Sequence, residues 1–61
     1  PDLSDNERMM CAYLKMNLST KEIAPLLNIS VRGVETIRYR LRKKFGLERE
    51  DSLTDYLNNK L

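Results

Sequence analysis

The segment that most constrains the fold of this chain is residues 30–45, SVRGVETIRYRLRKKF. At about 100° per residue on a helical wheel, four of its apolar side chains fall within roughly 80° of one another. These four are Val34, Ile37, Leu41 and Phe45. A stripe of this kind predicts an amphipathic helix over 31–45 that rests on a core along one side. Ser30 is the expected N-cap, and Gly46 stands where the helix should end.

This predicted helix also holds most of the positive charge. Residues 32–44 contain six Lys or Arg against one Glu, a net charge of +5, whereas the whole chain has a net charge of +2. The rest of the chain holds five basic and eight acidic residues and therefore has a net charge of −3. A strongly basic element in an otherwise mildly acidic chain is typical of a surface that binds a polyanion. Arg38 lies at the edge of the apolar stripe, where we expect its charge to pair with an acid such as Glu7 or Glu22.

Length and composition exclude several functional classes. Sixty-one residues form a single domain, 1–61, near the lower size limit for a chain that folds on its own core. One cysteine and no histidine exclude an internal disulfide, zinc-finger ligation and Ser-His or Cys-His catalysis. We therefore expect no enzymatic activity, no cofactor and no metal.

The chain also lacks the patterns of membrane and exported segments. No apolar run reaches the roughly 18–20 residues that span a membrane, and no signal-peptide pattern is present. We expect no membrane contact by this segment and a cytoplasmic location. The first residue is Pro rather than Met, so we expect a domain taken from a longer protein.

Two capping boxes precede the basic helix. The sequences SDNE at 4–7 and STKE at 19–22 both place a hydroxyl three residues before a carboxylate, the pattern that starts a helix. The first predicts a helix to about Met16 with its end at Asn17, and the second predicts a helix over about 20–27. Few residues favour strands, so the chain is expected to be all-α.

The predicted helices differ in how apolar they are. The first has Met10, Cys11, Tyr13 and Leu14 on its inner side. Its outer side carries Met9, Ala12 and Met16, which either pack partly against the N-terminal segment or contact the rest of the parent protein. The second turns Ile23, Ala24 and Leu27 inward and tolerates Pro25 because it is short. A last helix, capped by Asp51 or Ser52, turns Leu53, Tyr56, Leu57 and Leu61 to one side. Cys11 is interpreted as a buried structural thiol rather than a redox sensor.

The second and third helices, joined by a short turn at Asn28 and Ile29, form a helix-turn-helix pattern. In such a motif the first helix supports the second, whose outer face fits a DNA major groove about 12 Å wide. The outer face here carries Arg32, Thr36, Tyr39, Arg40 and Lys43.

The order and spacing of these motifs resemble the LuxR/GerE-type helix-turn-helix, an effector domain of bacterial response regulators and sensory transcription factors. The resemblance covers about residues 3–57. It rests on Leu3-Ser4 with Glu7, on Lys21-Glu22-Ile23-Ala24, on Ile29-Ser30, and on Lys44-Phe45-Gly46-Leu47. It implies a four-helix bundle of the winged-helix-like class without the wing, in which the third helix reads DNA and the fourth often mediates dimerisation. Within the family, the sequence is most similar to regulators of the Bacteroides group.

The resemblance also implies site residues. The base-reading positions of the family fall on Glu35, Thr36, Tyr39 and Arg40. Its phosphate-contacting positions fall on Thr20, Lys21, Arg32, Arg42 and Lys43. The dimer interface would use Leu53, Tyr56 and Leu57. Glu35 departs from the Lys that the family often has there, Gly33 from its usual Thr, and Asn17 from its usual Gly. Glu35 could accept a hydrogen bond from a cytosine amino group or pair within the helix with Arg38 or Tyr39.

The implied function is sequence-specific binding of double-stranded DNA through the major groove by the helix at 31–45. The domain would regulate transcription as the output of a signal-responsive regulator, such as the response regulator of a two-component system. Its partners would be DNA, a second copy of the chain on DNA, RNA polymerase and a sensory domain of the longer parent protein. Two alternatives stay open: a sigma-factor-like promoter-reading domain, and a helical protein-interaction module that binds an acidic partner.

Overall fold

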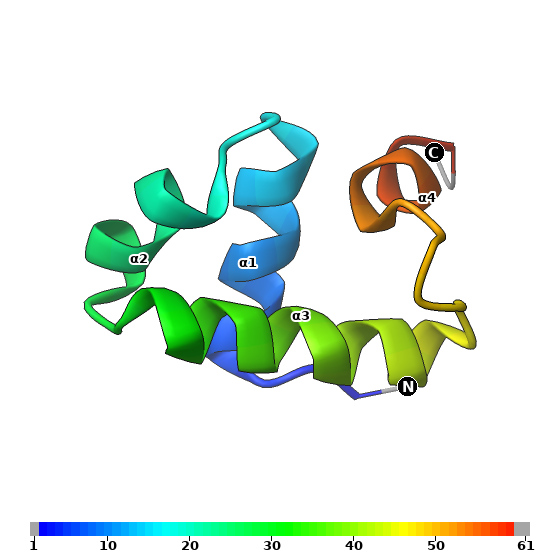
Figure 1. Ribbon diagram of the computed structural model, residues 1–61, viewed down its shortest axis with the longest axis horizontal. Helices are drawn as coiled ribbons and strands as arrows, with labels where there is room; N and C mark the ends of the chain where they lie inside the picture. Colours follow the sequence, from blue (N-terminus) through cyan, green and yellow to red (C-terminus); the bar gives the residue numbers. More distant parts are fainter. Residues whose placement is uncertain (1, 60–61) are drawn as a thin grey trace.

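Four helices make up the computed structural model of the chain, which describes residues 2–59 (Figure 1). They are α1 (Asp5–Lys15), α2 (Thr20–Leu27), α3 (Val31–Phe45) and α4 (Leu53–Asn59). No strand occurs within the described residues, and the all-α four-helix prediction is confirmed. Leu61, which was expected on the inner side of the last helix, lies outside the described residues.

Both predicted capping boxes are formed. The backbone N–H of Glu7 donates to Ser4 Oγ at 3.2 Å, and the N–H of Ser4 donates to Glu7 Oε1 at 2.8 Å. Ser19 and Glu22 repeat the arrangement at 3.2 and 2.7 Å. These bonds satisfy N–H groups that have no partner inside the helix, which is why α1 and α2 begin where they do. At the other end of α1, Asn17 has the left-handed φ of 65° expected of a stop residue.

The turn between α2 and α3 is equally compact. Asn28 ends α2 in the left-handed conformation, with φ 58° and ψ 41°. The N–H of Ile29 donates to the carbonyl of Ala24 at 3.0 Å, and Ser30 Oγ accepts from the N–H of Gly33 at 3.0 Å. The chain therefore leaves one helix and enters the next within three residues. Pro25 lies inside α2 as expected.

A single core holds the four helices together. α1 packs mainly against α4, and α2 packs mainly against α3, which runs along one side of the molecule (Figure 1). The buried apolar side chains are Met10, Leu14, Ile23, Ala24, Val34, Leu41, Leu53 and Leu57. On α3 the predicted stripe faces this core: Val34 and Leu41 are fully buried, and Ile37 and Phe45 are half-buried.

The C-terminal end of α3 is fixed by α4. The Phe45 ring stacks on Tyr56, with centroids 4.9 Å apart and ring planes 28° apart. Gly46 ends α3 with a φ of 70°, a conformation that favours glycine. Of the two residues expected to cap α4, Ser52 does so, because its Oγ accepts from the N–H of Asp55 at 3.2 Å. These contacts hold the far end of α3 in place.

The outer side of α1 is partly apolar. Met9 and Met16 are exposed by 43% and 67%, and Ala12 is exposed, as expected from the wheel. Cys11 packs against the core but is only half-buried, so its thiol is less enclosed than the sequence predicted. Burial raises the pKa of this thiol. Among residues 2–59, no helix combines the length and the apolar character needed to cross a bilayer.

Candidate nucleic-acid interface

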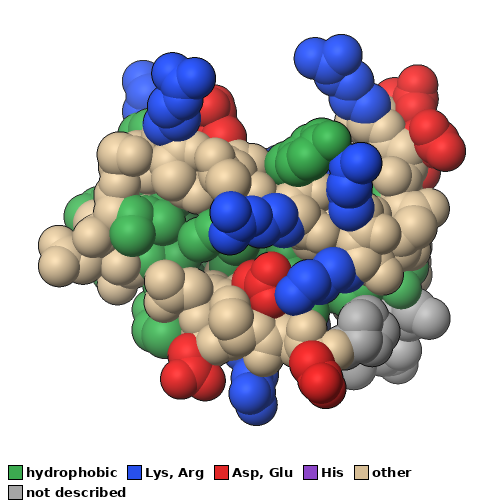
Figure 2. Space-filling view, turned by 90° about the horizontal axis from the view of Figure 1, so that it is seen from below, with side chains coloured by type: hydrophobic (Ala, Val, Ile, Leu, Met, Phe, Trp, Pro, Cys, Tyr) green, Lys and Arg blue, Asp and Glu red, His purple; other side chains and the backbone are tan. Residues whose placement is uncertain are grey.

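The surface of α3 that faces away from the core forms the candidate interface. Its exposed side chains are Arg32, Glu35, Thr36, Tyr39, Arg40 and Lys43. Because Val34 and Leu41 are completely buried on the opposite side, these six side chains project outward along the helix. Figure 2 views the molecule from the side on which α3 lies in Figure 1, and Lys and Arg side chains stand out from it among a few acidic ones. We call these six residues the reading face.

One basic side chain of α3 forms an ion pair within the protein. Lys44 Nζ forms an ion pair with Glu7 Oε1 at 2.7 Å and donates to the carbonyl of Asp2 at 3.0 Å. Glu7 is the one buried charged residue among those described, with 6% of its surface exposed. The hydrogen bond from Lys44 and that from the Ser4 backbone lower the pKa of the Glu7 carboxyl. The pair joins the start of α1 to the end of α3.

Arg38 packs as predicted, but its predicted partner is wrong. Its side chain is half-buried, and Nη1 donates to Thr20 Oγ1 at 3.2 Å rather than to a carboxylate. Glu7 is already paired with Lys44, and Glu22 accepts from the Ser19 backbone. Burial, together with the nearby Arg42 charge, lowers the pKa of the Arg38 guanidinium. Arg38 therefore ties α3 to α2.

The residues assigned to phosphate contacts are spread over two helices. Lys21 is exposed near the start of α2, whereas Thr20 is half-buried and its hydroxyl accepts the bond from Arg38. Arg42 is half-buried, and its Nε donates to the carbonyl of Asp51 at 3.5 Å. Lys43 is exposed, with its ammonium 5.3 Å from the centre of the Tyr39 ring. Of the residues assigned to phosphate contacts, Lys21, Arg32 and Lys43 form no ion pair with any residue of the range 2–59.

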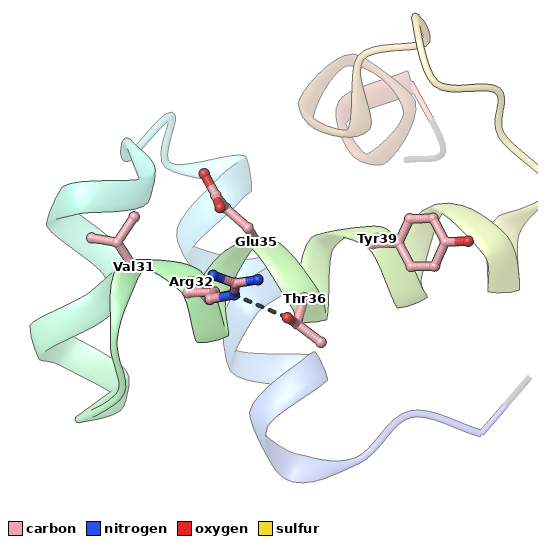
Figure 3. A pocket seen from close by; sticks show the side chains of 5 residues that line it. All are labelled: Val31, Arg32, Glu35, Thr36 and Tyr39. Atoms are coloured by element: carbon pink, nitrogen blue, oxygen red, sulfur yellow. Dashed lines mark hydrogen bonds between the residues drawn. The ribbon is translucent and has the colours of Figure 1, made fainter.

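Five side chains line a shallow hollow of about 460 Å³ on the reading face (Figure 3): Val31, Arg32, Glu35, Thr36 and Tyr39. Within it, Thr36 Oγ1 donates to the carbonyl of Arg32 at 3.1 Å. Glu35 makes no hydrogen bond or close ion pair with Arg38 or Tyr39, although its charge acts on Arg38 and opposes the lowering of the Arg38 pKa. Three of the four expected base-reading residues therefore line one hollow; Arg40 does not.

The structure adds two residues that the sequence reasoning did not single out. Val31, the first residue of α3, is 40% exposed and lines this hollow. Its position on the helical wheel, outside the core stripe, was a signal that its side chain is exposed. Arg49, in the loop after α3, joins Arg42 and Lys43 around a second hollow of about 540 Å³ at the end of the helix. No helical periodicity marks a loop residue, so its approach to α3 could not be inferred.

The fourth helix places its apolar side chains inside the fold. Leu53 is fully buried, Leu57 is 9% exposed, and Tyr56 is half-buried against Phe45. The two leucines assigned to a dimer interface are therefore core residues of this chain. A dimer contact through α4 would have to use its exposed side, which carries Asp55 and Asn58.

Comparison with known proteins gives one match. The family model GerE, described as bacterial regulatory proteins of the luxR family, matches residues 1–57. Neither the curated proteins nor the solved structures gave a match. The matched range includes all four helices except the last two residues of α4.

Proposed function

Because the chain belongs to the luxR family of bacterial regulatory proteins, which regulate transcription by binding DNA, we propose that it binds duplex DNA with α3 in the major groove. We further propose that it is the output domain of a longer, signal-responsive regulator. A helix with its side chains is about 10–12 Å across, and the major groove is about 12 Å wide, so one helix fits.

The observation that carries this proposal is the exposure of the reading face. Six adjacent polar or charged side chains of α3 project outward, three of them cationic, while the opposite side of the same helix is locked into the core. The outer face would contact DNA without rearrangement of the helix. The short turn at Asn28 and the bond from Arg38 to Thr20 fix α2 against α3, which supports a rigid helix-turn-helix unit.

We assign two kinds of contact within this surface. Glu35, Thr36, Tyr39 and Arg40 would meet base edges. Lys21, Arg32, Arg42 and Lys43 would neutralise phosphates, with Thr20 beside them. Lys21 extends the contact from α3 to α2, which would set the orientation of the domain on the duplex.

Regulation of transcription would require more than this one domain. A single domain this small covers few base pairs, so tight binding would need two copies on two half-sites. We propose that a sensory domain of the longer protein controls this pairing and that the bound regulator acts on RNA polymerase. The exposed side of α4 offers a surface for a second copy.

The test is binding to duplex DNA as the salt concentration rises. Four phosphate-contacting cations predict a slope of log K against log salt of about −3.6, at roughly 0.9 for each phosphate. Affinity should then fall by roughly 150-fold between 50 and 200 mM salt. Fluorescence anisotropy with a labelled duplex measures this directly. Absence of binding to any duplex at low salt would refute the proposal.

A further inference from the structure

The hydroxyl group of Thr36 is bonded back to the preceding turn of α3. Thr36 is exposed in the middle of the reading face, yet its hydroxyl donates to the carbonyl of Arg32, one turn earlier, at 3.1 Å. A hydroxyl has one hydrogen, so this bond uses the only donor of the side chain. The bond also holds the oxygen against the preceding turn. Figure 3 shows the methyl group of Thr36 pointing away from that turn.

The hollow around Thr36 offers a second apolar surface. Val31 lines the same hollow and is 40% exposed, although it belongs to the helix that carries most of the charge. Arg32, Glu35 and Tyr39 complete the lining. The hollow thus combines two side chains that present methyl groups with the carboxylate of Glu35.

Among the base edges in the major groove, only thymine presents a methyl group, at its C5 position. We propose that Thr36 recognises thymine through apolar contact between its methyl group and the thymine methyl, with Val31 as a second apolar wall. This inference rests on the proposed function. A hydrogen bond from the hydroxyl to a base would first break the bond to Arg32, whereas the methyl contact breaks nothing. Toward thymine, whose other major-groove group is the O4 acceptor, Thr36 therefore acts as an apolar residue.

Three proteins test this assignment: the unsubstituted chain, called the parent chain below, and the variants Thr36→Ser and Thr36→Val. Serine keeps a hydroxyl that can bond to the Arg32 carbonyl and lacks the methyl group. Valine keeps a methyl group and lacks the hydroxyl. Residue 36 is exposed, so neither change disturbs the core. Preferred sites are first selected from random duplexes with the parent chain. Each thymine of a selected site is then replaced singly by deoxyuridine, which lacks only the 5-methyl group.

The parent chain should bind about fourfold more weakly when one particular thymine is replaced, the equivalent of about 0.8 kcal/mol for one buried methyl group. Thr36→Val should keep this ratio. Thr36→Ser should lose it, and its affinity for the thymine site should fall to that of the parent chain for the uracil site.

Reading by the hydroxyl would give another pattern, because uracil keeps the O4 acceptor of thymine. The parent chain and Thr36→Ser would then bind the thymine and uracil sites equally well, and Thr36→Val would bind both more weakly. That result would overturn the proposal. A ratio that is the same in all three proteins at every thymine would also overturn it, while leaving DNA binding intact. Failure of the parent chain to bind any duplex would overturn both this inference and the proposed function.

Discussion

Adjacent lysines at the end of α3 should behave in opposite ways when each is replaced by glutamine. Lys43 is exposed on the reading face and forms no ion pair with another described residue, whereas Lys44 is paired with the buried Glu7 at 2.7 Å. The two residues have the same chemistry and neighbouring positions. A comparison of Lys43→Gln with Lys44→Gln therefore isolates the effect of the ion pair on DNA binding.

The expected size of the effect follows from counterion release. Loss of one phosphate contact reduces the salt slope by about 0.9, which at 0.1 M salt corresponds to about eightfold weaker binding. Lys43→Gln should show this reduction with little change in stability. Lys44→Gln should leave the slope unchanged and lower the urea concentration at which the chain unfolds, because it leaves the Glu7 carboxylate without its charged partner.

The assay is fluorescence anisotropy of a labelled duplex at four or more salt concentrations, combined with urea unfolding followed by circular dichroism. Circular dichroism at each salt concentration serves as the control that both variants stay folded. Equal losses of slope in the two variants would refute the reasoning, since they would mean that the pair with Glu7 does not keep Lys44 away from DNA.

Further predictions concern stability. Leu41→Ala should cost about 2–5 kcal/mol, against a total of roughly 3–9 kcal/mol for a chain of this length, and calorimetry should show a large fall in Tm or no folded state. The two glycines should respond with opposite signs. Gly33→Ala should stabilise the chain by about 0.5–1 kcal/mol, because its new methyl group would lie 3.4 Å from the Ile29 side chain, an ordinary contact. Gly46→Ala should cost about 1 kcal/mol, because residue 46 has a φ of +70°. Urea unfolding measures both changes. The pKa of Glu7 is lowered by Lys44, so its contribution to stability is complete above its unfolded value of 4.5 and is lost as the pH falls through the lower folded value. Unfolding midpoints measured downward from about pH 5 should fall more steeply for the parent chain than for Glu7→Gln.

The limits of each helix were predictable because the signals that set them are local. Ser19 and Glu22 bond within four residues of each other, and so do Ser30 and Gly33. Asn28 needed only its own tolerance of a positive φ. Such contacts join residues that are close in the sequence, so local sequence patterns predict them.

Partners that lie far apart in the sequence were not predictable in the same way. Lys44 meets Glu7 across 37 positions, and Arg38 meets Thr20 across 18. The helical wheel placed Arg38 at the edge of the core stripe. It could not show which residue of α2 stands opposite, because that depends on the angle at which the helices cross.

The candidate site shows the same division. The wheel correctly placed the side chain of Thr36 on the outside of α3, since exposure follows from helical periodicity. The direction of its hydroxyl depends on one side-chain torsion angle, which periodicity does not determine. Whether Thr36 meets a base at all stays a prediction.

The apolar stripe of α3 has a consequence for the choice of DNA sequence. Val34 and Leu41 fix the rotation of the helix about its own axis, because both are fully buried. With a radius of about 5–6 Å including side chains, a roll of 20° would carry a side-chain tip sideways by roughly 2 Å. A hydrogen bond to a base does not survive such a shift. If α3 reads bases as proposed, core residues that never approach DNA would help to decide which bases it prefers. A repacked core would then change the preferred operator without a change in any contacting residue.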